Sequence, residues 1–137
     1  MLDTNLCIRV LRRRVPELRA RFSAEADALC ISTIVLHELL HGAERSADPA
    51  KGRLQVSRFI SRLDVLPFDD AAAAHSAEIR AALARAGQTI SPIDLLIGGH
   101  ARSRGLVMVT GNLREFTRIA GLRCEDWQAD ATPPRPS

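Results

Sequence analysis

Three acidic side chains lie where a helix is expected to begin or to face the core, and together they could bind a divalent cation. Asp3 follows a short apolar start, Glu38 lies within a predicted helix beside Ile34 and Val35, and Asp94 opens an apolar run. Carboxylates that converge raise one another's pKa unless a cation neutralises them. Carboxylates completed by water suit Mg²⁺ or Mn²⁺, and such a site can activate water to hydrolyse a phosphodiester.

Two of these acids also have a simple structural explanation. Ser91, Pro92 and Asp94 form the start of a helix, with Ser91 as N-cap, Pro92 at the first helical position and Asp94 completing a capping box. Asp3 can likewise be a plain N-cap. Glu38 lies in the middle of its helix, where no capping role explains a carboxylate. The arrangement of the surrounding elements must therefore decide between capping and metal binding.

Strands that alternate with helices predict an α/β fold with a mainly parallel sheet covered on both faces. The strands are predicted at 1–3, 29–31, 65–68, 106–110 and 122–127, with a turn at 111–116. In such folds ligands bind at the carboxyl ends of the strands. Asp3 ends the first strand, and Asn112 and Glu115 come just after the strand that ends at Thr110, so this edge is the expected site.

The sequence His37-Glu38-Leu39-Leu40-His41 gives a rival interpretation, because it matches the HExxH pattern of zinc hydrolases on a predicted helix. A catalytic zinc needs a third protein ligand, and no downstream motif supplies one. A non-catalytic signalling domain with an acidic pocket is a further alternative. The chemistry of such a signalling domain requires a lysine late in the chain, whereas the only lysine here is Lys51.

The composition fits one globular domain that can meet a polyanion. The chain has 137 residues, a net charge of +3 and a pI near 9.2, with arginine carrying almost all the positive charge. No apolar run approaches the roughly 20 residues of a membrane span, and the scattered cysteines suit reduced core thiols. We expect a cytoplasmic protein with one domain over residues 1–128 and a disordered tail over 129–137.

Several blocks of sequence, taken in order, resemble the VapC-type PIN-domain ribonuclease toxins of type II toxin-antitoxin systems. They are Met1-Leu2-Asp3-Thr4-Asn5, Ile31-Ser32-Thr33, His37-Glu38-Leu39, Gly42-Ala43-Glu44-Arg45-Ser46, Asp94-Leu95-Leu96-Ile97 with His100-Ala101, Val109-Thr110, Asn112, Arg114-Glu115-Phe116, Gly121-Leu122 and Glu125-Asp126-Trp127. The resemblance implies a three-layer α/β/α sandwich. It also implies an endoribonuclease dependent on Mg²⁺ or Mn²⁺ that cleaves tRNA, rRNA or mRNA and inhibits translation.

The resemblance further implies a set of site residues and partners. Asp3, Glu38 and Asp94 would bind the metal. The family often has a fourth acid where this chain has Asn112, so either Asn112 or Glu115 is the fourth position. Hydrogen bonds to the acids or their waters would come from Thr4, Asn5 and Thr110. The implied partners are an RNA substrate, a cognate VapB-type antitoxin, and a second copy in a homodimer that forms a heterotetramer or larger assembly with the antitoxin, without membrane contact.

Overall fold

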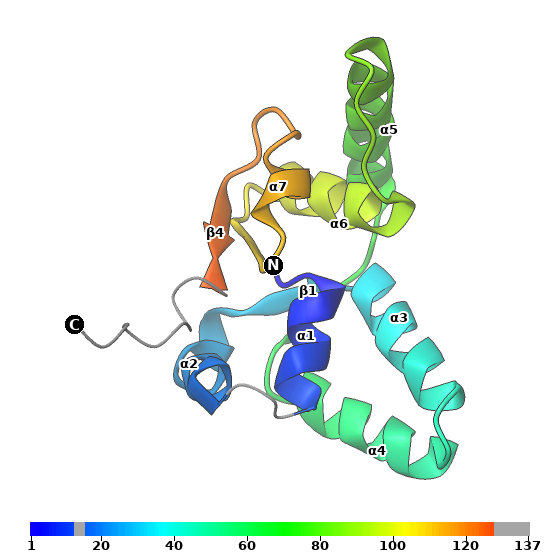
Figure 1. Cartoon of the computed structure of the whole chain (residues 1–137), viewed down its shortest axis with the longest axis vertical. Helices are drawn as coiled ribbons and strands as arrows, with labels where there is room; N and C mark the ends of the chain where they lie inside the picture. The colour runs from blue at the N-terminus through cyan, green and yellow to red at the C-terminus, as the bar shows by residue number, and fades with distance from the viewer. Residues whose placement is uncertain (13–15, 128–137) are drawn as a thin grey trace, which may run out of the picture.

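A computed structural model of the chain describes residues 1–12 and 16–127 (Figure 1). Short strands alternate with helices along this part of the chain. The strands are β1 (Cys30–Ser32), β2 (Asp64–Leu66), β3 (Met108–Thr110) and β4 (Cys124–Asp126). The α-helices are α1 (Thr4–Leu11), α2 (Pro16–Glu25), α3 (Thr33–Glu44), α4 (Pro49–Ile60), α5 (Asp70–Arg85), α6 (Pro92–Ser103) and α7 (Leu113–Phe116), and a 3₁₀ helix, η1, spans Ala26–Ala28.

The first three residues join two parallel strand pairs into one layer. Strand β1 pairs with β2, and β3 pairs with β4. Leu2 bridges to Val109 in parallel, and the amide of Leu2 donates to the carbonyl of Cys30 at 2.9 Å. The N-terminal ammonium also donates to the Val107 carbonyl at 2.7 Å. The spatial order is therefore β2, β1, the Met1–Asp3 segment, β3 and β4, so the start of the chain runs through the middle of the sheet.

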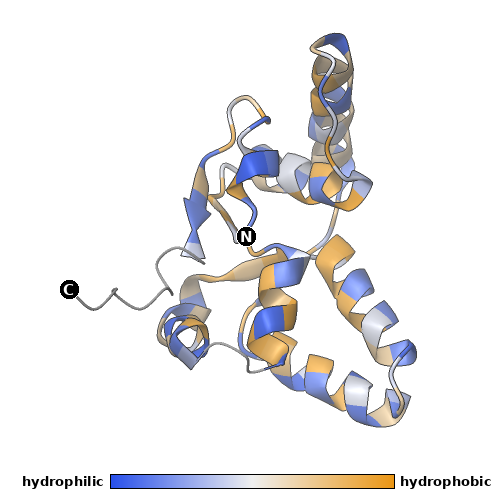
Figure 2. Cartoon of the chain, in the orientation of Figure 1, coloured by the Kyte–Doolittle hydropathy of each residue, from blue (hydrophilic) through white to orange (hydrophobic). Residues whose placement is uncertain are grey.

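Helices cover this layer from two sides. In Figure 1, α3 and α4 lie below the strands and α5, α6 and α7 lie above them. The core between the layers is apolar, because the strand residues Leu2, Ile31 and Met108 are at most 1% exposed. Figure 2 shows the same pattern, with hydrophobic colouring along β1 and at the start of α3. Burial of this apolar surface is the main term that holds the layers together.

Helices α5 and α6 pack closely because a glycine, Gly99, lies at their contact. Gly99 of α6 faces the backbone of Ser76 in α5, and a Cβ placed on Gly99 would lie 2.8 Å from the Ser76 Cα atom. The Ser76 hydroxyl donates to the Ala72 carbonyl of its own helix at 2.8 Å, so this buried polar group is satisfied. Glycine at position 99 therefore sets the distance between the two helices, and α6 carries Asp94.

Most expectations for the fold are confirmed. The fold is α/β with parallel strands, and Ser91 caps α6 as expected, its hydroxyl accepting from the Asp94 amide at 3.3 Å. The strands are shorter than predicted, and the turn expected at 111–116 contains the helix α7. No helix of the described residues is long and apolar enough to cross a membrane. The tail predicted at 129–137 lies outside the described residues.

Candidate metal centre

Asp3 is a buried carboxylate at the point where the N-terminal segment meets α1. Its side chain is 2% exposed. One oxygen accepts a hydrogen bond from the Leu6 amide at 2.8 Å, as an N-cap does. The other accepts a hydrogen bond from the Thr110 hydroxyl. Burial raises the pKa of Asp3 by more than these two hydrogen bonds lower it, so the pKa is raised overall. Asp3 is thus a capping residue and also a desolvated carboxylate that a cation would stabilise.

A chain of hydrogen bonds runs from Asp3 to the helix that follows β3. Thr110, which donates to Asp3, accepts from the Asn112 amide nitrogen at 2.7 Å. The Asn112 side chain then donates from Nδ2 to Glu115 Oε2 at 2.9 Å. The other oxygen of Glu115 accepts from the Ser91 amide at 3.0 Å. These contacts orient Glu115 and tie the start of α6 to the end of β3.

Asp94 completes the cluster from the first turn of α6. Its carboxyl group is half-buried and is hydrogen-bonded to Glu115. Desolvation, the contact with Glu115 and the negative charge of Asp3 raise the pKa of Asp94 to about 7, whereas the hydrogen bond from Asp94 lowers the pKa of Glu115. A proton on Asp94 would allow it to donate to Glu115, because two ionised carboxylates this close repel each other.

The donor set of this cluster fits a divalent metal ion. Asp3, Asp94 and Glu115 are all carboxylates, and their mutual repulsion is what a bound cation would relieve. Two helices, α1 and α6, direct their N-terminal ends at the cluster, which favours negative charge there. A hollow of about 170 Å³ opens beside Asp3 and is also lined by Asn112. The oxygen donors of these residues are therefore of the kind that a hard cation such as Mg²⁺ or Mn²⁺ prefers.

Glu38, the third acid expected at the site, takes no part in the contacts among Asp3, Asp94 and Glu115. It is partly buried on α3 and lines a hollow of about 410 Å³ between α1, α3 and α4. Within residues 1–12 and 16–127, no three His, Cys, Asp or Glu side chains form a group that could hold a metal ion as they stand. The structure thus brings together two of the three expected acids and adds Glu115.

The two histidines of the HExxH pattern have no third metal ligand beside them in the described part of the chain. His37 and His41 are both exposed on α3, with ring centroids 6.3 Å apart in an edge-to-face arrangement. No acid, cysteine or histidine joins them to form a group of three among those residues. The geometry gives the zinc interpretation no support.

The side chains around the acids differ in how they contribute. Of the three expected to hydrogen-bond the site, Thr110 contacts Asp3, whereas the Thr4 hydroxyl is buried without a described hydrogen-bond partner and Asn5 is exposed beside the hollow. Arg9, one helical turn after Asn5, also lines this hollow and lowers the pKa of Asp3. Sequence reasoning overlooked Arg9, although its i, i+4 spacing from Asn5 placed it on the same helix face.

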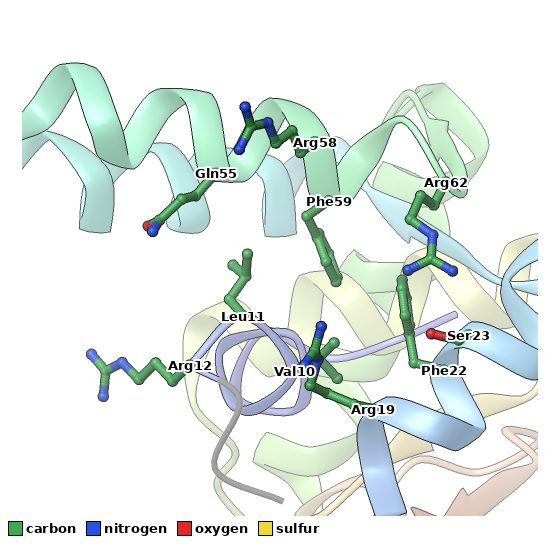
Figure 3. A pocket seen from close by; sticks show the side chains of 10 residues that line it. All are labelled: Val10, Leu11, Arg12, Arg19, Phe22, Ser23, Gln55, Arg58, Phe59 and Arg62. Atoms are coloured by element: carbon green, nitrogen blue, oxygen red, sulfur yellow. The ribbon is translucent and has the colours of Figure 1, made fainter. Parts of the chain in front are cut away.

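A larger hollow of about 740 Å³ lies at the other end of α1, between α1, α2 and α4 (Figure 3). Its floor is apolar, because Phe22 and Phe59 stack with ring centroids 5.0 Å apart. Four arginines also line the hollow, namely Arg12, Arg19, Arg58 and Arg62, and the Arg62 guanidinium group lies 5.5 Å from the centroid of the Phe22 ring. None of the described residues that line this hollow is acidic, so its chemistry suits an acidic or amphipathic partner rather than a metal ion.

Comparison with known proteins places this arrangement in a family. The PIN domain family model matches residues 1–122. The tRNA(fMet)-specific endonuclease VapC of Salmonella typhimurium is 52% identical over 93% of this chain and 96% of its own. A chain in the structure of DNA-bound VapBC from the same organism has a TM-score of 0.88, with the same coverage. A chain in the structure of VapBC-1 from nontypeable Haemophilus influenzae is 31% identical and has a TM-score of 0.84. The match covers 93% of this chain and 97% of that one.

Proposed function

Because the chain belongs to the PIN-domain family, as a VapC-type ribonuclease toxin, we propose that it cleaves tRNA(fMet) at a metal site formed by Asp3, Asp94 and Glu115. The substrate follows from relatives that share about half of its residues and carry that activity. The observation that supports the site is the contact of Asp94 with Glu115 beside buried Asp3. Glu38 of α3, which lines a separate hollow, stays in the proposed site because of the family resemblance alone.

The family is typically metal-dependent, and we propose Mg²⁺ or Mn²⁺ for this chain. When bound, such an ion supplies Lewis-acid activation of water and neutralises the charge of the phosphate. Asp3, Asp94 and Glu115 would hold it through their oxygens. Thr110 hydrogen-bonds Asp3 and Asn112 hydrogen-bonds Glu115, so these two contacts orient the carboxylates. Asp94 must release its proton before it can act as a ligand.

The partner of a VapC toxin is a VapB antitoxin, and the arginine-rimmed hollow of Figure 3 is the surface that suits it best. Its apolar floor, with Phe22 and Phe59, would bind an apolar helix face, and its guanidinium groups would pair with acidic side chains. A homodimer, its heterotetramer with the antitoxin and a cytoplasmic location complete the proposal. Light scattering of the toxin alone and of the complex would measure the two assemblies.

Purified protein tests the function directly. We expect metal-dependent internal cleavage of a tRNA(fMet) transcript and none of a different tRNA. Asp3→Asn, Glu38→Gln and Asp94→Asn should each abolish cleavage while the protein stays folded by circular dichroism. Asp70→Asn is the matched control, because Asp70 is an exposed acid in the first turn of α5. Full activity in all three site variants would contradict the assignment.

A further inference from the structure

Arg9 lies where a phosphate of the substrate would pass beside the acids. It occupies the last turn of α1, and the helix places it on the same face as Asn5. Both side chains line the hollow of about 170 Å³ that also reaches Asp3, with Gly111 and Asn112 in the same lining. One hollow therefore contains a metal-binding acid and a guanidinium group.

The guanidinium group of Arg9 is not engaged by a neighbour in the described part of the chain. Other arginines form close ion pairs there: Arg53 with Glu44 at 2.7 Å and Arg102 with Glu78 at 3.1 Å. Arg9 has no ion pair within 4.0 Å and no side-chain hydrogen bond among residues 1–12 and 16–127, although it is half-buried. Its effect on Asp3 acts through space, because the positive charge lowers the pKa of that carboxyl.

The acids alone would repel RNA. Asp3, Asp94 and Glu115 bring negative charge to the place where the phosphodiester must lie, and a bound divalent cation offsets only part of it. A guanidinium group binds phosphate oxygens through a planar pair of donors. Arg9 is the cation that lines the hollow with Asp3, on a helix that holds its backbone in place.

We propose that Arg9 binds a phosphate of the substrate RNA next to the bond that is cut. This inference rests on the proposed function and deepens it. The alternative role for Arg9 is structural: a cation in the last turn of a helix interacts favourably with the helix dipole. The two roles differ in what they change, because only a phosphate contact alters the salt dependence of RNA binding.

The test measures binding of a fluorescent tRNA(fMet) transcript to the full chain carrying Asp94→Asn, which binds without cutting. Adding Arg9→Gln should raise Kd about tenfold and reduce the slope of log Kd against log salt by about 0.7 to 0.9. Arg9→Lys should restore the slope but only part of the affinity, because lysine lacks the planar fork. The matched control is Arg85→Gln, an exposed arginine in the last turn of α5, which should change neither quantity.

An unchanged Kd and slope in the Arg9→Gln protein would overturn the proposal, as would an equal loss in the Arg85→Gln protein. If thermal unfolding shows that Arg9→Gln damages the fold, the Arg9→Lys protein decides, and a lysine variant that binds with the reduced slope overturns the proposal. Cleavage by the chain without substitutions is measured in parallel. Normal cleavage with unaltered binding in the Arg9→Gln protein would leave the nuclease assignment standing and remove only the role of Arg9.

Discussion

The close approach of α5 and α6 makes Gly99→Ala the substitution with the most definite expected effect on stability. A Cβ at position 99 would lie 2.2 Å from the Ser76 hydroxyl oxygen, 2.8 Å from its Cα atom and 2.9 Å from its nitrogen. The hydroxyl can rotate away, but the Cα and nitrogen belong to the backbone of α5. Ordinary contact begins at 3.4 Å, so the two helices must separate by about 0.6 Å.

The expected loss of stability follows from two opposing terms. Overpacking of a well-packed core typically costs about 1–3 kcal/mol. Alanine is favoured over glycine in a helix interior by about 1 kcal/mol, which offsets part of that cost. Because the clash is with backbone, we take the upper end of the range, and the net loss is about 2 kcal/mol. For a domain of this size that corresponds to a fall in Tm of roughly 6–10 °C.

Thermal and urea unfolding of the purified chain measure this loss. Gly42→Ala is the matched control, because nothing lies within 4 Å of a Cβ built on this α3 glycine, and it should raise Tm by a few degrees. The double variant Ser76→Ala with Gly99→Ala removes the hydroxyl but not the backbone contact, so it should remain destabilised. A Gly99→Ala protein as stable as the unaltered chain, or full recovery in the double variant, would refute the reasoning.

Four further results are expected. The gain in Tm caused by Mn²⁺ should grow from pH 5.5 to pH 8, because the ion must displace the proton of Asp94, whose pKa is about 7; an equal gain at both pH values would contradict this. Without metal, the stabilisation from that proton is complete below about pH 4 and is lost as pH rises through 7, which pH-dependent melting measures. Glu115→Gln should shrink the Mn²⁺ gain, and an undiminished gain would remove Glu115 from the metal centre. His37→Ala with His41→Ala should keep metal-dependent RNase activity, whereas bound zinc that this double variant loses would favour the zinc hydrolase.

The sequence predicted those features that depend on neighbouring residues. The caps Asp3 and Ser91 could be predicted because each lies just before its helix and accepts from the amide three residues later. Asp48 and Asp69 cap α4 and α5 in the same way. The order of strands and helices could be predicted from apolar runs separated by turn residues. Capping and burial for Asp3 proved compatible, since one oxygen meets the Leu6 amide and the other meets Thr110.

The features that sequence reasoning missed depend on contacts between distant segments. Strand length is one of them: residues 106–110 form a continuous apolar run, but the ladder with β4 covers only Met108–Thr110. The contact of Glu115 with Asp94 is another, because it requires the short helix α7, which nothing in residues 111–116 distinguished from a turn. Likewise, the need for glycine at position 99 is visible only once Ser76 lies opposite.

Glu38 was predicted from the sequence as a site acid, and it is absent from the contacts that join the other acids. Its mid-helix position excluded a cap, and the structure places it, partly buried, on the wall of a hollow shared with Ile8 and Leu11 of α1. Helix periodicity predicted the side of α3 on which it lies. The distance between α3 and α6, which determines whether its carboxylate reaches a shared ion, depends on packing across the whole sheet.

The place of Met1–Asp3 in the middle of the sheet has a consequence for how the protein is made. These residues are synthesised about 100 residues before their hydrogen-bonding partners at Val107 and Val109. Contacts this far apart in sequence make folding slow, and a nascent chain shorter than about 110 residues lacks both Thr110 and Glu115. The contacts around Asp3 and Glu115 therefore cannot form before synthesis has passed residue 115.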